Sequence, residues 1–329
     1  MHILVTGAAG MIGRKLVESF ARQPQIAAQP ITQLTLADVV PPPTLPSFIG
    51  QSRIVTGDIA DVKIIHDLVA PRPDVIFHLA AVVSGEAERD FEKGYHVNLA
   101  GTQALFEAIR LNGMRHKWVP RVVYASSNAV FGGDFPDVIP DDFHLTPQTS
   151  YGVQKAIGEL LLQDYSRKGF FDGIGIRLPT ISVRPGRPNA AASGFFSGII
   201  REPLVGQEAI LPVSDETRHW MTSPRSAIGF LRRAAALDTS LLAGDPNLSM
   251  PALSITVGEQ IAALKRVAGE KAVRLIRRVP DAEIEKIVLG WARGFDPKRA
   301  IALGFTSETS YDEVIRAHIE DELGGEIRL

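Results

Sequence analysis

The sequence of 329 residues contains no cysteine. This absence excludes disulfide bonds, thiolate metal sites and a cysteine nucleophile. Basic and acidic side chains are nearly equal in number, 35 against 37, so the formal net charge is only −2. The chain therefore lacks the positive excess that attracts a nucleic acid backbone or an anionic membrane surface. We predict no nucleic-acid partner and no membrane partner.

Long apolar runs are also absent. The apolar stretches at 75–77 and 80–83 are far shorter than the roughly 20 residues that a transmembrane helix needs. The chain begins with a short apolar segment and a glycine-rich turn, without the pattern of a secretory leader, so we expect a cytoplasmic protein. The eight histidines are scattered without a close pair at ligand spacing, and we predict no metal site.

The residues that are present have the balance of a globular protein, with 45% apolar and 22% charged side chains. Short aliphatic runs alternate with helical patterns through the first half, which predicts an α/β fold with a Rossmann-type, doubly wound parallel sheet. The expected helices are 15–22, 61–69, 95–110 and 151–167. The expected strands are 3–5, 34–36, 53–56, 75–78, 121–125 and 173–177.

A glycine-rich turn at 6–13, Thr-Gly-Ala-Ala-Gly-Met-Ile-Gly, follows the first expected strand and opens a helix. Gly7 permits the tight turn, Gly10 lets a pyrophosphate approach the backbone, and Gly13 lets the helix pack on the sheet. A purely structural turn is the alternative, because a glycine triplet alone is a weak signal. Its place between strand and helix favours a dinucleotide site, with cofactor contacts from Gly7, Gly10, Met11 and Ile12.

Carboxylates follow the second and third expected strands. Asp38 lies where a ribose-binding carboxylate is expected, and it would repel a 2′-phosphate. Val39 and Val40 offer no arginine to hold such a phosphate, so NAD is favoured over NADP. A solvated loop carboxylate is the alternative reading of Asp38. Asp58 and Ile59 are similarly placed to hold the adenine.

Tyr151 and Lys155 stand one helical turn apart on the same expected helix face. An ammonium near a phenol stabilises the phenolate, so a tyrosine that normally titrates near 10 can act as a base near neutral pH. Such a pair is more often part of a surface or core rim. Here it follows a strand that ends in Ser126 and Ser127.

Together these motifs resemble the extended short-chain dehydrogenase/reductase family, which includes nucleotide-sugar epimerases and dehydratases. The resemblance covers essentially the whole chain. It rests on the glycine-rich turn and on Gly-Asp-Ile at 57–59, His-Leu-Ala-Ala at 78–81, Asn-Leu-Ala-Gly-Thr at 98–102, Ala-Ser-Ser-Asn-Ala-Val-Phe-Gly at 125–132 and Tyr-Gly-Val-Gln-Lys at 151–155.

The resemblance implies roles for individual residues. Tyr151 would be the general base, Lys155 would lower its pKa and hold the nicotinamide ribose, and Ser127 would bind the reacting oxygen. Residues that would contact the cofactor are Leu79, Ala80, Ala81, Asn98, Ser126 and Pro179. Dehydratases of the family carry an acid pair after the catalytic serine, whereas this chain has Asn128 and Ala129 there. Dehydration is therefore disfavoured, and epimerisation is not excluded.

The second half carries a run of arginines, at 177, 184, 187, 201, 218 and 225. A guanidinium suits a carboxylate and a diphosphate equally well, so this charge does not choose the substrate. We expect most of these arginines to form surface or structural ion pairs and one or two to reach the substrate.

Longer stretches at 82–88, 143–147, 173–180, 192–197 and 218–225 are similar to family members that oxidise the four-carbon sugar acid D-erythronate at carbon 2 with NAD. For His219 a packed histidine beside Trp220 is an equal alternative, and we expect His78 to be structural. The substrate contacts that follow from this similarity are Ser84, Ser127, Asn128, Tyr151, Arg184, Arg218 and His219.

Two other functions stay open. A nucleotide-sugar epimerase would keep NAD bound and release no net NADH. A catalytically silent dinucleotide-binding regulator is disfavoured because Tyr151, Lys155 and Ser127 are all present. We expect residues 1–180 to form the NAD-binding domain and 181–329 a smaller C-terminal substrate lobe that could return a strand to the sheet. By family analogy we expect a homodimer through the helices at 95–110 and 151–167.

Overall fold

A seven-stranded sheet forms the centre of the structure, a computed structural model that describes residues 1–45, 47–186 and 192–329. All neighbouring strands in the sheet are parallel. In spatial order the strands are β13 (Asn247–Ser249), β9 (Asp172–Leu178), β7 (Arg121–Ser127), β6 (Val75–His78), β1 (His2–Thr6), β4 (Gln33–Asp38) and β5 (Gln51–Thr56). The predicted α/β fold with a doubly wound parallel sheet is confirmed.

The strand order reverses next to β1. From β1 the chain adds β4 and β5 on one side, then crosses over to place β6, β7, β9 and β13 on the other. Such a reversal opens a crevice at the carboxyl ends of the strands, where ligands bind in folds of this kind. All six predicted strands are found, and the seventh, β13, comes from the second half of the chain.

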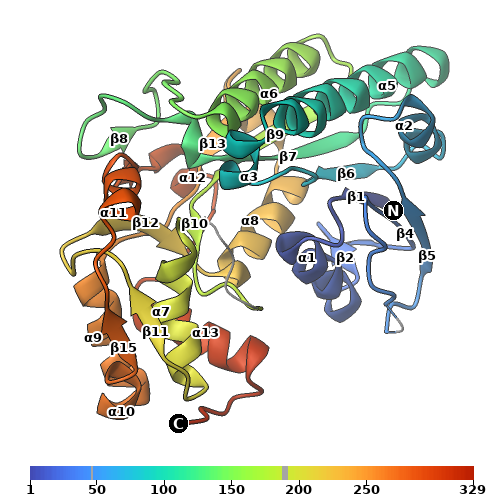
Figure 1. Ribbon diagram of the computed structural model, residues 1–329. Coiled ribbons are helices and arrows are strands. Elements are labelled where there is room, and N and C mark those ends of the chain that lie inside the picture. The colour runs from blue at the N-terminus through green and yellow to red at the C-terminus, as the bar shows by residue number, and fades with distance from the viewer. Residues whose placement is uncertain (46, 187–191) are drawn as a thin grey trace.

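Helices cover both faces of the sheet (Figure 1). One face packs against α2 (Val62–Val69), α5 (Gly101–His116) and α6 (Ser150–Arg167). The other packs against α1 (Met11–Arg22) and α8 (Pro224–Ala236), while α12 (Lys298–Ala302) lies beside β13. Each face of the sheet has its own apolar core, and successive strand residues alternate between them. Leu4 packs in the core under α2, α5 and α6, whereas Ile3 and Val5 pack in the core under α1 and α8.

The predicted helix at 95–110 begins differently from the expectation. Its first part is a π-helix, η1 (Tyr95–Ala100), which continues directly into α5. The Thr102 hydroxyl donates a hydrogen bond to the Asn98 carbonyl at 2.7 Å, and the Asn98 side chain is buried. Such wide turns occur often at functional sites. This one brings Asn98 under the crevice.

The remaining elements of the sheet half are short. They are β2 (Gln25–Ile26), β3 (Gln29–Pro30), α3 (Ser84–Arg89), α4 (Phe91–Gly94), η2 (Asn128–Val130), β8 (Ile139–Pro140) and η3 (Thr239–Leu242). The proline-rich segment 41–45 after β4 is irregular, and Pro46 lies outside the described residues.

A second lobe with its own apolar core lies at the carboxyl ends of the sheet strands (Figure 1). Its strands are β10 (Thr180–Ile181), β12 (Arg218–Thr222), β14 (Leu253–Thr256), β11 (Ala209–Leu211), β15 (Ile276–Arg278) and β16 (Phe295–Asp296). Its helices are α7 (Gly194–Leu204), α9 (Val257–Ala268), α10 (Glu270–Val273), α11 (Ala282–Leu289) and α13 (Tyr311–Glu322). Within the described residues, no helix has both the length and the apolarity of a membrane span.

Candidate active site

The glycine-rich turn lies directly against the end of β6. Gly7 has φ +75°, and a Cβ at this position would lie 2.6 Å from the Ala80 nitrogen. At Gly13 a Cβ would lie 2.1 Å from the Gly7 oxygen. The turn therefore needs glycine both for its backbone conformation and for its close packing. The N-terminus of α1, with Met11 and Ile12 half-buried, faces this cradle, which fits a pyrophosphate.

Asp38 closes the other side of the turn. Its Oδ2 accepts a hydrogen bond from the Ala9 N–H at 2.8 Å, and its Oδ1 accepts one from the Val40 N–H at 3.4 Å. The carboxylate is therefore held beside the phosphate cradle, at the carboxyl end of β4. This position fits a ribose-binding residue.

Asp58 makes a side-chain hydrogen bond with His96 that the sequence analysis did not anticipate. Its carboxylate accepts a hydrogen bond from the Ala60 N–H and lies 2.8 Å from His96 Nε2. Burial acts to raise the pKa of Asp58, but these bonds outweigh it and hold the pKa below its ordinary value. Ile59 is buried and packs on Gly101, where a Cβ would lie 2.6 Å from its Cγ2.

Tyr151 and Ser127 meet at the carboxyl end of β7. Ser127 is the last residue of this strand, and Tyr151 is the second residue of α6, whose first turn is capped by Thr149. Burial raises the pKa of Tyr151 to about 12, and the Ser127 side chain acts in the opposite direction. With this pKa the tyrosine is a neutral phenol at neutral pH, even with Lys155 one helical turn away.

Lys155 lies on the next turn of α6. Its Nζ lies 5.7 Å from the centroid of the Tyr151 ring and donates a hydrogen bond to the Ala125 carbonyl at 2.8 Å. Burial lowers the pKa of Lys155 to about 8, while the charge of Glu159 acts to raise it. The predicted tyrosine, lysine and serine are thus brought together by one strand end and one helix.

Two predicted cofactor residues are held by protein groups. Ser126 is buried, and its hydroxyl donates to Glu159 Oε1 at 2.5 Å. Asn98 binds both the N–H and the carbonyl of Val82 and donates to Gln154 Oε1 at 2.7 Å. Their observed contacts fix the strand end and the loop after β6, next to the half-buried Leu79, Ala80 and Ala81.

His78 is buried at the end of β6, as expected for a structural residue. Its Nδ1 lies 2.8 Å from the Thr6 hydroxyl and its Nε2 lies 2.9 Å from the Thr102 hydroxyl. Burial lowers the pKa of His78 to about 3, and the Lys155 charge adds to this effect. The ring is therefore neutral and joins three elements beneath the crevice.

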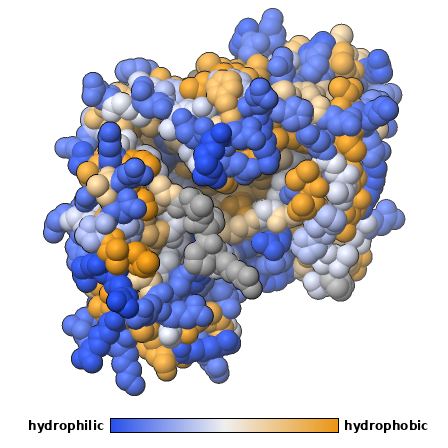
Figure 2. Space-filling model, viewed as in Figure 1, coloured by the Kyte–Doolittle hydropathy of each residue, from blue (hydrophilic) through white to orange (hydrophobic). Residues whose placement is uncertain are grey.

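Asn128 provides an unsatisfied acceptor at the site. Its Oδ1 is buried and has no hydrogen-bond partner among the described residues. Ser84, another predicted substrate residue, is half-buried at the start of α3. Figure 2 shows a hollow between the sheet half and the second lobe on the viewed face.

The arginines of the second half separate into two kinds. Four of them pair with carboxylates: Arg177 with Glu159, Arg201 with Glu202, Arg218 with Glu259, and Arg225 with Glu320 and Asp321. Arg187 lies outside the described residues.

Arg184 is the different one, because no carboxylate of the described residues pairs with it. Its guanidinium donates to the Ile181 carbonyl at 3.0 Å and to the Ser193 hydroxyl at 2.6 Å. Burial lowers the pKa of Arg184, and the neighbouring charge of Arg201 lowers it further. An anion at this position would relieve both effects.

His219 of β12 is held by a contact with β10. Its Nε2 lies 2.6 Å from the Thr180 hydroxyl, directly after Pro179, and its ring stacks on Phe196 at 5.1 Å. Burial, followed by the Arg184 charge, lowers the pKa of His219 to about 3, so the ring is neutral.

The structure does not bring Arg218 into this group. Side chains alternate along a strand, and Arg218 extends from the opposite face of β12 to His219. There it donates to the Ser254 carbonyl at 2.8 Å and pairs with Glu259 at 3.4 Å. Its positive charge is therefore already balanced by another part of the lobe.

Comparison with known proteins agrees with this geometry. Residues 3–223 match the NAD dependent epimerase/dehydratase family. The chain belongs to this family. The predicted resemblance and the predicted cofactor, NAD, are thereby confirmed. The cradle at Gly7 and the carboxylate of Asp38 are the features of this chain that fit NAD.

Named relatives of the family extend over nearly the whole chain. A D-erythronate dehydrogenase from Cupriavidus necator is 47% identical over 325 residues, which cover 98% of each chain. A second protein of that name, from Haemophilus influenzae, is 38% identical and covers 98% of this chain and 100% of its own. These relatives confirm the prediction of an NAD-dependent dehydrogenase.

A solved structure, described as a nucleoside-diphosphate-sugar epimerase from Agrobacterium tumefaciens, is 58% identical to this chain. It superposes with a TM-score of 0.97 and covers 99% of this chain and 95% of its own. This likeness extends the family assignment to the second lobe.

Several residues of the site were not identified by the sequence analysis. They are His96, Gln154, Glu159 and Thr180, which bind Asp58, Asn98, Ser126 and His219 respectively. Glu159 alone had a visible signal, because it continues the four-residue spacing of Tyr151 and Lys155. The others depend on contacts between distant segments.

Proposed function

We propose that this chain oxidises the carbon 2 hydroxyl of D-erythronate to the 2-oxo acid with NAD. The observation that carries the proposal is Arg184, a guanidinium that donates to Ile181 and Ser193 and has no carboxylate partner among the described residues. Its charge acts on His219, which binds Thr180, two residues after the Leu178 that pairs with Ser127. A substrate acid would supply the missing carboxylate. The two relatives named D-erythronate dehydrogenase support this choice of acid.

In the proposed mechanism Tyr151 is the general base. As a phenolate it takes the proton of the carbon 2 hydroxyl, while Ser127 binds the same oxygen. Lys155 favours the phenolate through its charge, against the burial that raises the pKa of Tyr151 to about 12. NAD, when bound, accepts the hydride that leaves carbon 2. Proton and hydride together account for the two electrons lost by the alcohol.

The proposed cofactor contacts follow from the cradle outward. Gly7, Gly10, Met11 and Ile12 face the pyrophosphate, and Asp38 binds the adenosine ribose. Asp58 and Ile59 lie on the adenine side, and Lys155 reaches the nicotinamide ribose. The loop residues and the strand end complete the channel: Leu79, Ala80, Ala81, Asn98, Ser126 and Pro179.

The proposed substrate contacts divide by chemistry. Arg184 binds the carboxylate, and Ser84 and the neutral His219 add polar contacts. The unsatisfied Oδ1 of Asn128 is an acceptor, so it suits a substrate hydroxyl and not the carboxylate. A small polyhydroxy acid offers both groups at once.

The decisive experiment is to mix the purified protein with NAD and a panel of four- and five-carbon sugar acids and to follow NADH absorbance. D-Erythronate and L-threonate are the first members of the panel, with NADP in parallel. The expected result is net NADH formation from NAD with D-erythronate, and little NADPH formation from NADP. Absence of NADH with every acid would contradict the proposal.

A nucleotide-sugar epimerase is the second candidate, because the similar Agrobacterium tumefaciens structure is described by that name. An epimerase regenerates its NAD in each turnover. Tightly bound cofactor in the purified protein, with no net NADH from any acid, is the outcome that would favour it.

Two further predictions concern the protein in the cell. A role in sugar acid catabolism, in the cytoplasm, follows from the proposed substrate and the NAD requirement. A homodimer through α5 and α6 stays a prediction, supported by the exposed apolar side chains Leu111, Met114 and Leu160 on these two helices.

A further inference from the structure

Successive residues at the end of β7 interact with residues of α6. Ala125 accepts a hydrogen bond from Lys155 and Ser126 donates one to Glu159, while the Ser127 side chain acts on the pKa of Tyr151. Because Tyr151, Lys155 and Glu159 are spaced four residues apart, they lie on one face of α6. The strand end is thus hydrogen-bonded to two successive turns of the helix, and Glu159 makes the second connection.

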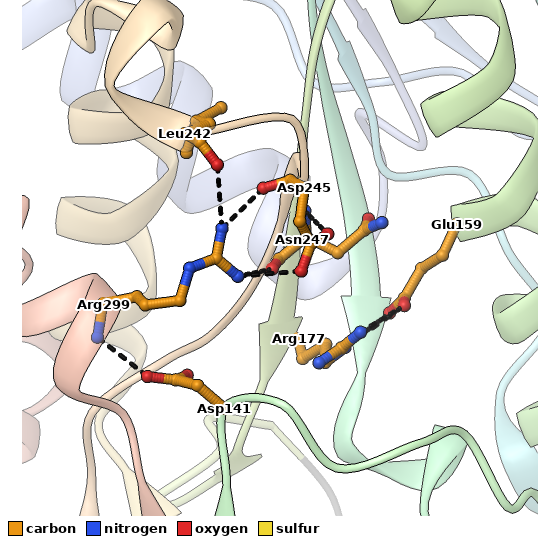
Figure 3. A network of polar contacts seen from close by, with 7 residues as sticks. All are labelled: Asp141, Glu159, Arg177, Leu242, Asp245, Asn247 and Arg299. Carbon is orange, nitrogen blue, oxygen red and sulfur yellow. Dashed lines mark hydrogen bonds and ion pairs between the residues drawn. The ribbon is translucent and has the colours of Figure 1, made fainter.

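Glu159 is also half of a buried ion pair with Arg177 of β9. The Arg177 guanidinium donates to Glu159 through Nε at 3.0 Å and through Nη2 at 2.8 Å, as Figure 3 shows from close by. The side chains of Arg177 and Glu159 are only 7% and 2% exposed. The Arg177 guanidinium carbon also lies 5.1 Å from the centroid of the Phe131 ring. Phe131 directly follows η2, which carries Asn128.

The charges of the four side chains Tyr151, Lys155, Glu159 and Arg177 sum to zero only when Tyr151 is ionised. With Tyr151 as a phenol, the group contains two cations, Lys155 and Arg177, and one anion, Glu159. With Tyr151 as a phenolate, there are two of each sign. Asp141 and Asp245 also act on Arg177, whereas Glu159 is the anion that acts on Lys155. Loss of Glu159 would therefore leave Lys155 without its anion, and Lys155 is the cation that can release its proton.

We propose that Glu159 is a positioning residue for the reaction, which fixes the end of β7 through Ser126 and keeps the Lys155 ammonium protonated while Tyr151 acts as base. This inference rests on the proposed role of Tyr151 and Lys155. It assigns to Glu159 a chemical effect in addition to packing.

The surroundings of Lys155 make Glu159 the anion that faces it. The other titratable groups around it are the Tyr124 ring of β7, 4.9 Å from Nζ, His78 of β6, and Tyr151 one turn earlier on α6. Arg177 reaches the group from β9 by way of Glu159. Burial lowers the pKa of Lys155 to about 8, and Glu159 opposes this effect.

The test is the pH profile of kcat/KM for D-erythronate oxidation in Glu159→Gln. Without the anion Lys155 should lose its proton at lower pH, so the alkaline limb should move to lower pH by about one unit. Glu159→Asp keeps the charge but shortens the side chain. It should lower kcat and leave the alkaline limb near its wild-type position.

A matched control lies on the same two strands. At their amino ends Arg121 pairs with Asp172, remote from Lys155. Asp172→Asn also removes a carboxylate from an arginine, and it should lower stability without moving the alkaline limb. The inference is overturned by an unmoved limb in Glu159→Gln, or by an equal movement in Glu159→Asp or Asp172→Asn.

Removing one member of a buried ion pair is strongly destabilising, whereas removing both is often tolerated. If Glu159→Gln does not fold, the double variant Glu159→Gln/Arg177→Gln gives the same reading, because Arg177 acts on Lys155 only from beyond Glu159. The limb should again move to lower pH, and an unmoved limb would refute the inference. Failure of the proposed function is distinguishable, because the wild-type protein itself would then form no NADH from D-erythronate.

Discussion

The two ends of the strand pair β7 and β9 carry the same kind of ion pair in different surroundings. At the carboxyl end Arg177 and Glu159 are 7% and 2% exposed and lie next to Lys155. At the amino end Arg121 and Asp172 are 15% and 38% exposed. Arg121 there also donates to the carbonyls of Ala234 and Leu237, which anchors the end of α8.

The two ion pairs therefore have different roles within one sheet: the pair at the carboxyl end serves the chemistry, and the pair at the amino end anchors a helix. A partly exposed pair gains little net energy but holds a helix end in place. A fully buried pair pays a large desolvation penalty, so an apolar replacement would stabilise the fold at least as well. The carboxyl end retains its charges because they act on neighbouring groups. We therefore expect substitutions there to change turnover and those at the amino end to change stability.

The largest expected effect is that of Tyr151→Phe. Removing the proposed base should lower kcat about 100- to 10,000-fold, because general base catalysis typically contributes that much. The ring and its packing are retained, so NAD binding and the melting temperature should stay close to wild type. NADH formation and NAD binding by fluorescence measure the two properties separately.

Tyr165→Phe is the control on the same helix. Tyr165 lies near the far end of α6, where its hydroxyl donates to Glu107 at 3.1 Å. Its loss should leave turnover unchanged. Equal losses of kcat in the two variants, or retained turnover in Tyr151→Phe, would contradict the assignment of the base.

Arg184→Gln tests how the substrate is held at the same edge. A charged hydrogen bond to the carboxylate is worth enough that its loss should raise KM for D-erythronate about 10- to 100-fold. Binding of NAD should not change. Arg218→Gln, on the opposite face of β12, should change KM less than about twofold. If the two variants have the same KM, Arg184 does not bind the carboxylate.

Low pH should destabilise the folded protein through two buried, neutral histidines, His78 and His219. His78 and His219 have pKa values lowered to about 3 by burial, against about 6.5 in an unfolded chain. Between these values the unfolded state binds more protons, so the free energy of unfolding falls as the pH falls below 6.5. Each histidine should contribute a loss of about 2 kcal/mol between pH 7.5 and pH 5.

Urea unfolding at the two pH values measures this loss. His78→Asn is less stable at both, since it loses the bonds to Thr6 and Thr102, but its stability should depend less on pH by about 2 kcal/mol. The same pH dependence in wild type and His78→Asn would show that His78 does not titrate on unfolding.

Local sequence patterns predicted the scaffold and the centre of the site. Strands such as β1 are read from short aliphatic runs, and the glycine spacing predicted the turn at Gly7 because that backbone geometry admits no other residue. The Tyr151 and Lys155 pair follows from helical spacing. Each of these signals is contained within a few neighbouring residues.

The remaining features depend on contacts between distant segments. Arg177 and Arg184 belong to the same run in the sequence, yet Arg177 pairs with Glu159 whereas Arg184 binds Ile181 and Ser193 and no described carboxylate. Likewise Asp58 meets His96 only because η1 lies beside the turn that follows β5. Residue type alone could not distinguish these outcomes, since they are decided by which strands become neighbours.

The smallest expected effect lies far from the proposed site, in the two-residue turn between β2 and β3. Ala27 and Ala28 both have positive φ, 46° and 64°, in a conformation that a Cβ disfavours. Ala28→Gly should therefore raise the free energy of unfolding by about 0.5 kcal/mol, with kcat unchanged. The same substitution at Ala21, inside α1, should lower it by up to about 1 kcal/mol. Urea unfolding of both variants distinguishes backbone strain at the turn from a general effect of glycine, and a loss of stability in Ala28→Gly would show that the turn is not strained.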